Sequence, residues 1–116
     1  YVEGTSDVTF SGTNKVVECN VLGDARLTFK SATSLCANLA QSYDNATLTL
    51  DGVTLISDDS IPSFTAQGTS TINITNVNAI PDTVVYAVEN GTVNITGGTG
   101  WDDSMFEESD SGKINH

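Results

Sequence analysis

Short triplets in which a Thr or Asn lies between two apolar residues recur along the chain. Their first residues are separated by 19, 21, 24 and 21 positions, and the triplets are Val8-Thr9-Phe10, Leu27-Thr28-Phe29, Leu48-Thr49-Leu50, Ile72-Asn73-Ile74 and Val93-Asn94-Ile95. Turn-forming pairs such as Gly23-Asp24 and Asn90-Gly91 precede them. Alternation with a period of two, bounded by turns, predicts β-strands and does not fit a helix.

A second apolar segment lies within each interval, at residues 16–22, 35–39, 61–66 and 84–88. Each repeat of about twenty residues is therefore expected to carry two or three short strands. A near-constant repeat of this length is typical of a solenoid, in which every coil stacks on the previous one. Because side chains alternate along a strand, the apolar members of each triplet should face a shared core, and the Thr or Asn column should face outward.

Two stretches carry a family resemblance. Residues 45–55 (NATLTLDGVTL) and residues 90–98 (NGTVNITGG) resemble the coils of right-handed parallel β-helix proteins, the pectin-lyase-like superfold. The resemblance extends over residues 7–98 and implies an all-β, parallel β-solenoid of about five coils, as in secreted or surface proteins. It implies little about activity, because that fold supports lyases, hydrolases, phage spikes and adhesins. An immunoglobulin-like or pilin-like β-sandwich remains the alternative, since short alternating strands can also close into two packed sheets.

The pattern changes after the last triplet. We expect residues 1–100 to form the β-solenoid and residues 101–116 to form a short, acidic C-terminal cap or tail. Ser104 and Glu107 have the spacing of a capping box that begins one helical turn. The apolar residues that would cover the last coil are Trp101, Met105 and Phe106.

The N-terminus has no comparable plug, so the first coil is expected to expose its strand edge and its core. This asymmetry makes self-association the main functional lead. The candidate assembly residues are Val8 and Phe10 in the first coil and Trp101 and Phe106 after the last. The expected partner is another copy of the chain, in a homo-oligomer or a filament, and glycans are a further candidate. The alternatives for the open end are weak pairing by Tyr1 and Val2 or coverage by another domain.

Charge excludes several classes of partner. The 116 residues include 15 acidic and 4 basic residues, for a formal net charge of -11. This balance argues against nucleic-acid binding, which relies on clustered Lys and Arg, and against an anionic membrane surface. The longest uncharged stretch, residues 60–81, is rich in Ser, Thr and Asn, so no membrane insertion is predicted. The chain opens at Tyr1 without an apolar leader, as a mature or excised segment does.

The two cysteines, Cys19 and Cys36, are separated by 17 positions and fall in adjacent coils. Neighbouring coils of a parallel solenoid lie about 4.8 Å apart, so a bridge is within reach if the turns bring both residues into register. We therefore predict a Cys19–Cys36 disulfide, which places the protein outside the cytoplasm. Two buried free thiols are the alternative.

Four Asn-x-Ser/Thr sequons are candidate N-glycosylation sites, at Asn45, Asn73, Asn90 and Asn94. Asn73 and Asn94 lie at the outward centres of triplets, so glycans there would project from stacked strands and cover one face. Occupied sequons would make the protein an extracellular glycoprotein.

Paired carboxylates at Asp102 and Asp103 are the candidate metal ligands, and calcium is the one cofactor that the sequence suggests. Asp clusters also perform acid and base chemistry in hydrolases of the pectin-lyase-like superfold. No catalytic residues are identified, because the single His is His116 and the four basic residues are scattered along the chain. The chain is therefore not predicted to be an enzyme.

These observations predict an extracellular structural or adhesive protein, a self-assembling subunit of a surface filament or stalk. The alternative is a carbohydrate-binding or carbohydrate-processing β-helix that depends on calcium. An ice-binding face formed by the outward Thr and Asn column is a third candidate, which Arg26, Lys30 and Asp51 weaken because they interrupt the array.

Overall fold

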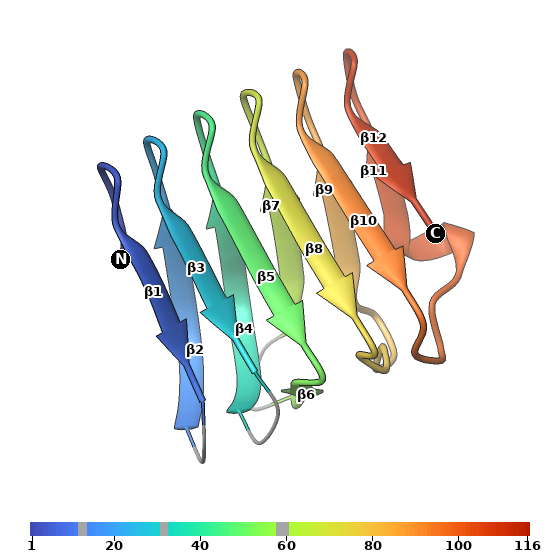
Figure 1. Ribbon diagram of the computed structural model, residues 1–116. Coiled ribbons are helices and arrows are strands. Elements are labelled where there is room, and N and C mark those ends of the chain that lie inside the picture. The colour runs from blue at the N-terminus through green and yellow to red at the C-terminus, as the bar shows by residue number, and fades with distance from the viewer. Residues whose placement is uncertain (12–13, 31–32, 58–60) are drawn as a thin grey trace.

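The computed structural model of the chain describes residues 1–11, 14–30, 33–57 and 61–116, and the side chains of residues 14–17 and 33–39 lie outside that description. Two six-stranded sheets face each other across the molecule (Figure 1). In spatial order, the front sheet contains β1 (Asp7–Phe10), β3 (Arg26–Phe29), β5 (Thr47–Asp51), β8 (Thr71–Thr75), β10 (Thr92–Thr96) and β12 (Lys113–Asn115). The back sheet contains β11 (Phe106–Glu108), β9 (Val84–Ala87), β7 (Ser63–Ala66), β4 (Thr33–Ser42) and β2 (Asn14–Val21), with β6 (Thr54–Leu55) paired to β4.

All the strand pairs formed by the described residues are parallel, which confirms the predicted β-solenoid. The sandwich alternative is wrong, because sandwiches of the immunoglobulin type are built from antiparallel sheets. The chain descends the front sheet and ascends the back sheet while it advances from β1 toward β12 (Figure 1). The solenoid is therefore right-handed, as parallel crossovers almost always are.

The predicted triplets coincide with the front strands, and the register confirms their alignment. Leu27 lies opposite Leu48, which lies opposite Ile72, and Ile72 lies opposite Val93. These four side chains are at most 2% exposed, whereas the Thr and Asn residues between the apolar positions are half-buried on the outer face. The alternation of apolar and polar residues therefore places the core between the two sheets.

One turn position repeats along the edge where the back strands lead into the front strands. Its residues have positive φ angles and are Gly4, Gly23, Asp44, Gly68, Glu89 and Asp110. In each of the last five turns, the backbone amide of the residue after this position donates a hydrogen bond of 2.8 to 3.0 Å. The acceptor is the carbonyl oxygen of the positive-φ residue in the preceding turn. The turns therefore stack in register with the strands, and their backbone hydrogen bonds continue the ladder.

The C-terminal segment does not leave the solenoid. β11 pairs with β9 and β12 pairs with β10, so residues 106–108 and 113–115 add one strand to each sheet. A 3₁₀ helix, η1 (Asp103–Met105), connects the end of the repeat to β11. The predicted capping box is wrong, because Asp102 is the N-cap and Glu107 lies in β11. Asp102 reaches the amide of Ser104 two residues ahead, which suits a turn too short for the Ser104–Glu107 spacing.

The predicted disulfide is not formed. Cys19 is a free, buried thiol, and its strand partner in the register is Ala40. The register between β2 and β4 shifts between the pairs Val16 with Leu35 and Glu18 with Leu39. Cys36 falls within that irregular stretch of β4, four positions before the residue that faces Cys19. Spacing along the chain could not reveal this shift, because it is a property of the strand pairing.

Candidate functional site

The N-terminal end of the solenoid exposes apolar side chains. Phe10 is 43% exposed and Tyr1 is 77% exposed, although the triplet pattern places Phe10 in the inward column. The ring of Phe10 stacks on that of Phe29, with centroids 5.4 Å apart, and Val8 is half-buried against the core. β1 is the edge strand and only β3 lies beside it, so Phe10 is exposed at the open first coil, as the sequence predicts. Apolar side chains that continue the core are therefore exposed at this end.

The backbone of β1 also presents unpaired hydrogen-bonding groups. Arg26 N donates to Ser6 O at 2.8 Å, and Lys30 N donates to Phe10 O at 3.0 Å. Because alternate residues of a strand direct their N–H and C=O groups to opposite neighbours, those of Asp7 and Thr9 point away from β3. An exposed edge of this kind is a template for a further strand.

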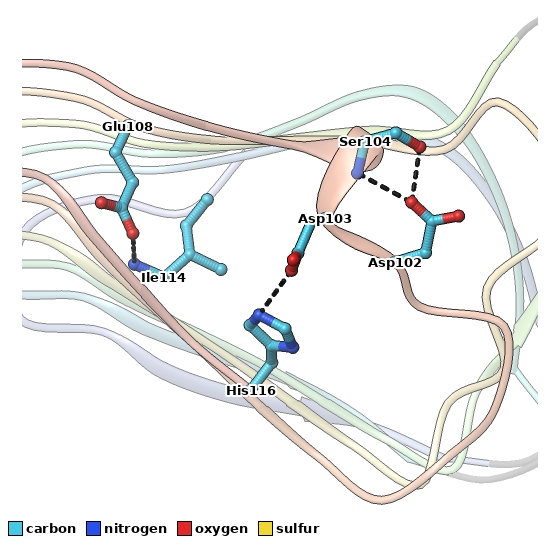
Figure 2. A network of polar contacts seen from close by, with 6 residues as sticks. All are labelled: Asp102, Asp103, Ser104, Glu108, Ile114 and His116. Carbon is cyan, nitrogen blue, oxygen red and sulfur yellow. Dashed lines mark hydrogen bonds and ion pairs between the residues drawn. The ribbon is translucent and has the colours of Figure 1, made fainter.

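Aromatic side chains pack together at the C-terminal end. Trp101 Nε1 donates to Val77 O at 2.8 Å, and the Trp101 and Phe106 rings stack with centroids 6.4 Å apart. The His116 ring meets Phe106 edge to face at 4.5 Å, and His116 Nε2 lies 3.1 Å from Asp103 Oδ1. Figure 2 shows this contact beside the 3₁₀ helix. Trp101 and Phe106 thus pack against the core, as the sequence predicted for a cap.

Glu108 adds a polar closure to the same end. Its Oε1 accepts a hydrogen bond of 2.9 Å from the amide of Ile114 (Figure 2). The bond joins the last strand of the back sheet, β11, to the last strand of the front sheet, β12. No signal in the sequence distinguishes Glu108 from the neighbouring Glu107.

The two candidate calcium ligands turn to different partners. Asp102 Oδ1 accepts from the amide of Ser104 at 2.7 Å and from its hydroxyl at 2.5 Å, whereas Asp103 faces His116 (Figure 2). The hydroxyl bond, followed by the amide bond, lowers the pKa of the Asp102 carboxyl. In the described part of the chain, no three His, Cys, Asp or Glu residues converge as a metal site requires. The calcium site therefore stays a prediction.

An open cavity of about 550 Å³ lies beside these residues. Asp82 and Asp102 are its charged lining residues, and Ile61, Pro81 and Met105 contribute apolar surface. Its volume is within the range of sites for small ligands.

The four sequons divide into two pairs. Asn45 and Asn90 lie on exposed turns. Asn73 and Asn94 lie at half-buried positions on the outer face, where Asn94 Nδ2 donates to Asn73 Oδ1 at 3.0 Å. Asn115 Nδ2 continues this ladder by donating to Asn94 Oδ1 at 2.8 Å. The sequence analysis missed Asn115, although Ile114 follows Val93 by the usual 21 positions.

No protein-family model, curated protein or solved structure matches the chain. Among the described residues, no helix is long and apolar enough to cross a bilayer. The inference of function therefore rests on the solenoid and its two ends.

Proposed function

We propose that this chain is an extracellular structural module that binds a second copy of itself through the N-terminal end of the solenoid. The observation that carries the proposal is the contrast between the two ends. The N-terminal end exposes Tyr1, Phe10 and the edge of β1, whereas at the C-terminal end Trp101 and Phe106 are partly buried against the core. Burying exposed apolar surface is the main source of free energy in protein association.

Two copies of β1 can pair antiparallel around a two-fold axis that passes between their Thr9 residues. The outward N–H and C=O groups of Thr9 in each copy then meet. In this register, Val8 of one copy lies opposite Phe10 of the second copy, and both face the core side. The two sheets of each solenoid continue into those of the second copy, which gives a closed two-fold dimer.

The charge distribution also favours association through the N-terminal end. Residues 1–30 contain four acidic and three basic residues, whereas the rest of the chain contains eleven acidic and one basic. Two N-terminal ends can therefore approach with little repulsion, although each chain carries a charge of -11.

Two features support an extracellular location. Asn45 and Asn90 lie on exposed turns within sequons. The repeat resembles the coils of pectin-lyase-like β-helices, which occur in secreted and surface proteins. Mass spectrometry of the protein from its natural source, before and after enzymatic deglycosylation, tests this part of the proposal; an unmodified mass would count against the glycoprotein.

Sedimentation of the purified chain over a wide range of concentrations tests the self-association. We expect the mass to rise from 12.2 kDa to twice that value. Phe10→Asp should abolish the dimer because it buries a charge at the interface. Thr9→Pro should weaken it because proline removes the outward amide, and an edge strand tolerates this change where the amide does not serve its own sheet.

The matched control is Ile61→Asp, which changes another exposed apolar residue (51% exposed) away from the N-terminal end. This variant should dimerise like the wild type. Circular dichroism establishes that each variant keeps its β-structure. A wild-type chain that stays monomeric at millimolar concentration overturns the proposal, and so does a Phe10→Asp variant that folds and still dimerises.

A further inference from the structure

The last residue of β11, Glu108, is exposed at the end of the solenoid, but its strand register aligns it with a buried column. The strand register aligns Val2, Val21, Ser42, Ala66, Ala87 and Glu108 in one column of the back sheet. The four middle members are completely buried. Glu108 is therefore a carboxylate at the inward-facing position of the terminal strand. Its neighbour Glu107 belongs to the outward column, opposite Tyr86.

The Glu108 carboxylate also occupies the edge of the front sheet. Lys113 N donates to Gly91 O at 3.0 Å, so the amides of Lys113 and Asn115 face β10. The amide of Ile114 between them points to the open side, where a further strand would accept its hydrogen bond. Glu108 Oε1 accepts that bond instead, at 2.9 Å (Figure 2).

A chain that stacks on this end meets two obstacles. It must displace Glu108 from Ile114 N, and it must bury the exposed carboxylate next to Ala87, at the end of a column whose other members are Val, Ser and Ala. A buried charge without a partner is costly. Inward-pointing charges at edge strands are a known device against edge-to-edge association. At the N-terminal end of the solenoid, the same column ends in Val2, which carries no charge.

Head-to-tail stacking would otherwise suit this chain. It would place Lys113 beside Asp7 of a second copy, because both belong to the first column of the front sheet. That pair has opposite charges and the strands are parallel, as within the solenoid. Glu108 is therefore the residue that opposes the growth of a filament by repeated head-to-tail stacking.

We propose that Glu108 closes the C-terminal end, so that end-to-end association of the chain stops at two copies. This inference rests on the proposed function, because it defines which end is used and why growth stops. The partner at the N-terminal end is a second copy, and the C-terminal end remains free of other copies.

The test compares the assembly of Glu108→Ala with that of the matched control Glu107→Ala. Alanine at position 108 reproduces the residue that neighbouring coils carry in this column, at Ala66 and Ala87. Both variants lose one negative charge from the same strand, so a general charge effect is common to them. Sedimentation and electron microscopy measure the particle mass and the length of the stacks.

We expect the wild type and Glu107→Ala to stop at the mass of two copies, and Glu108→Ala to form longer stacks whose mass grows with concentration. If the wild type and Glu108→Ala both stop at two copies, the role of Glu108 is wrong and the proposed function stands. If the wild type is monomeric and Glu108→Ala dimerises, the proposed function is wrong and the closure by Glu108 stands. Filaments of the wild type overturn the closure. If Glu108→Ala fails to fold, Glu108→Gln, which keeps an acceptor for Ile114 N, is measured by the same criteria.

Discussion

Small residues follow the turn in every coil from the second to the last, at Ala25, Ala46, Ser70, Gly91 and Gly112. A Cβ atom added to Gly91 would lie 2.2 Å from Ala66 O, and one added to Gly112 would lie 2.1 Å from Ala87 O. At this position the chain passes close to the backbone of the preceding coil. The close stacking of the coils therefore requires a small side chain at this position.

Cys19 shows the same dependence on neighbours. The side chain is 3% exposed, and this burial raises the pKa of its thiol from 9.0 to about 12. A thiol with this pKa is almost entirely protonated at neutral pH, and the thiolate is the reactive form. The environment of Cys19 is therefore that of an inert core residue.

We predict that Cys19 resists alkylation in the folded protein at pH 8 and reacts when the chain is unfolded without reductant. Peptide mass spectrometry after a short pulse of iodoacetamide measures the modified fraction at Cys19. Absence of modification in the unfolded, unreduced chain would show that a disulfide has formed after all.

The raised pKa also fixes the sign of a pH effect on stability. The folded state holds the Cys19 proton up to about pH 12, whereas the unfolded state releases it near pH 9.0. The stabilisation is fully present below pH 9 and is lost as the pH rises through 12. The stability of the wild type relative to Cys19→Ala should therefore fall above pH 9, by at most about 1.4 kcal/mol per pH unit. Urea titrations at pH 8, 9 and 10 measure this difference; a constant difference contradicts it.

At the scale of elements, the asparagine ladder connects the last three front strands. Asn94 on β10 donates to Asn73 on β8 and accepts from Asn115 on β12. β12 has three residues, so the side-chain bond of Asn115 adds to a short backbone ladder. The ladder begins at β8, because the equivalent residue on β5 is Thr49.

Asn94→Ala removes both side-chain bonds, so we predict a loss of about 1–2 kcal/mol in the free energy of unfolding. A double-mutant cycle with Asn115→Ala separates the ladder from the change in strand propensity. The coupling free energy should be about 0.5–1.5 kcal/mol, measured by chemical denaturation. A coupling of zero would mean that the amides do not stabilise the attachment of β12.

At the scale of the molecule, charge and apolar exposure are distributed unequally between the two ends. Residues 101–116 contain five acidic residues and one Lys, whereas the first 30 residues are nearly balanced. The exposed Tyr1 and Phe10 lie at the balanced end. Both distributions favour contact between N-terminal ends.

The dimer should therefore become tighter with added salt. Each copy carries a net charge of -11, and salt screens the remaining repulsion between the two copies. We expect the dissociation constant to fall several-fold between low and physiological ionic strength, as measured by sedimentation equilibrium. Weakening by salt would instead indicate an attractive contact such as Lys113 with Asp7, and hence head-to-tail stacking.

The sequence was sufficient for the coil and its core, because both depend on local pattern. Alternation in triplets such as Leu48-Thr49-Leu50 set which side chains face inward, and the spacing of 19 to 24 residues set which triplets stack. Trp101 and Phe106 were recognisable as a cap because they are large and apolar and follow the last repeat. Each of these features is visible within one repeat or from its periodicity.

Tertiary structure alone decided the pairing of Cys19 with Ala40 and the role of Glu108. The register shift within β4 moves Cys36 away from Cys19, and no local pattern encodes that shift. Glu107 and Glu108 are equivalent in sequence, and only the pairing of β11 with β9 turns one outward and the other toward the core. The strand pattern therefore specifies which residues can be buried, whereas the stacking of coils decides which residues meet and which ends stay open.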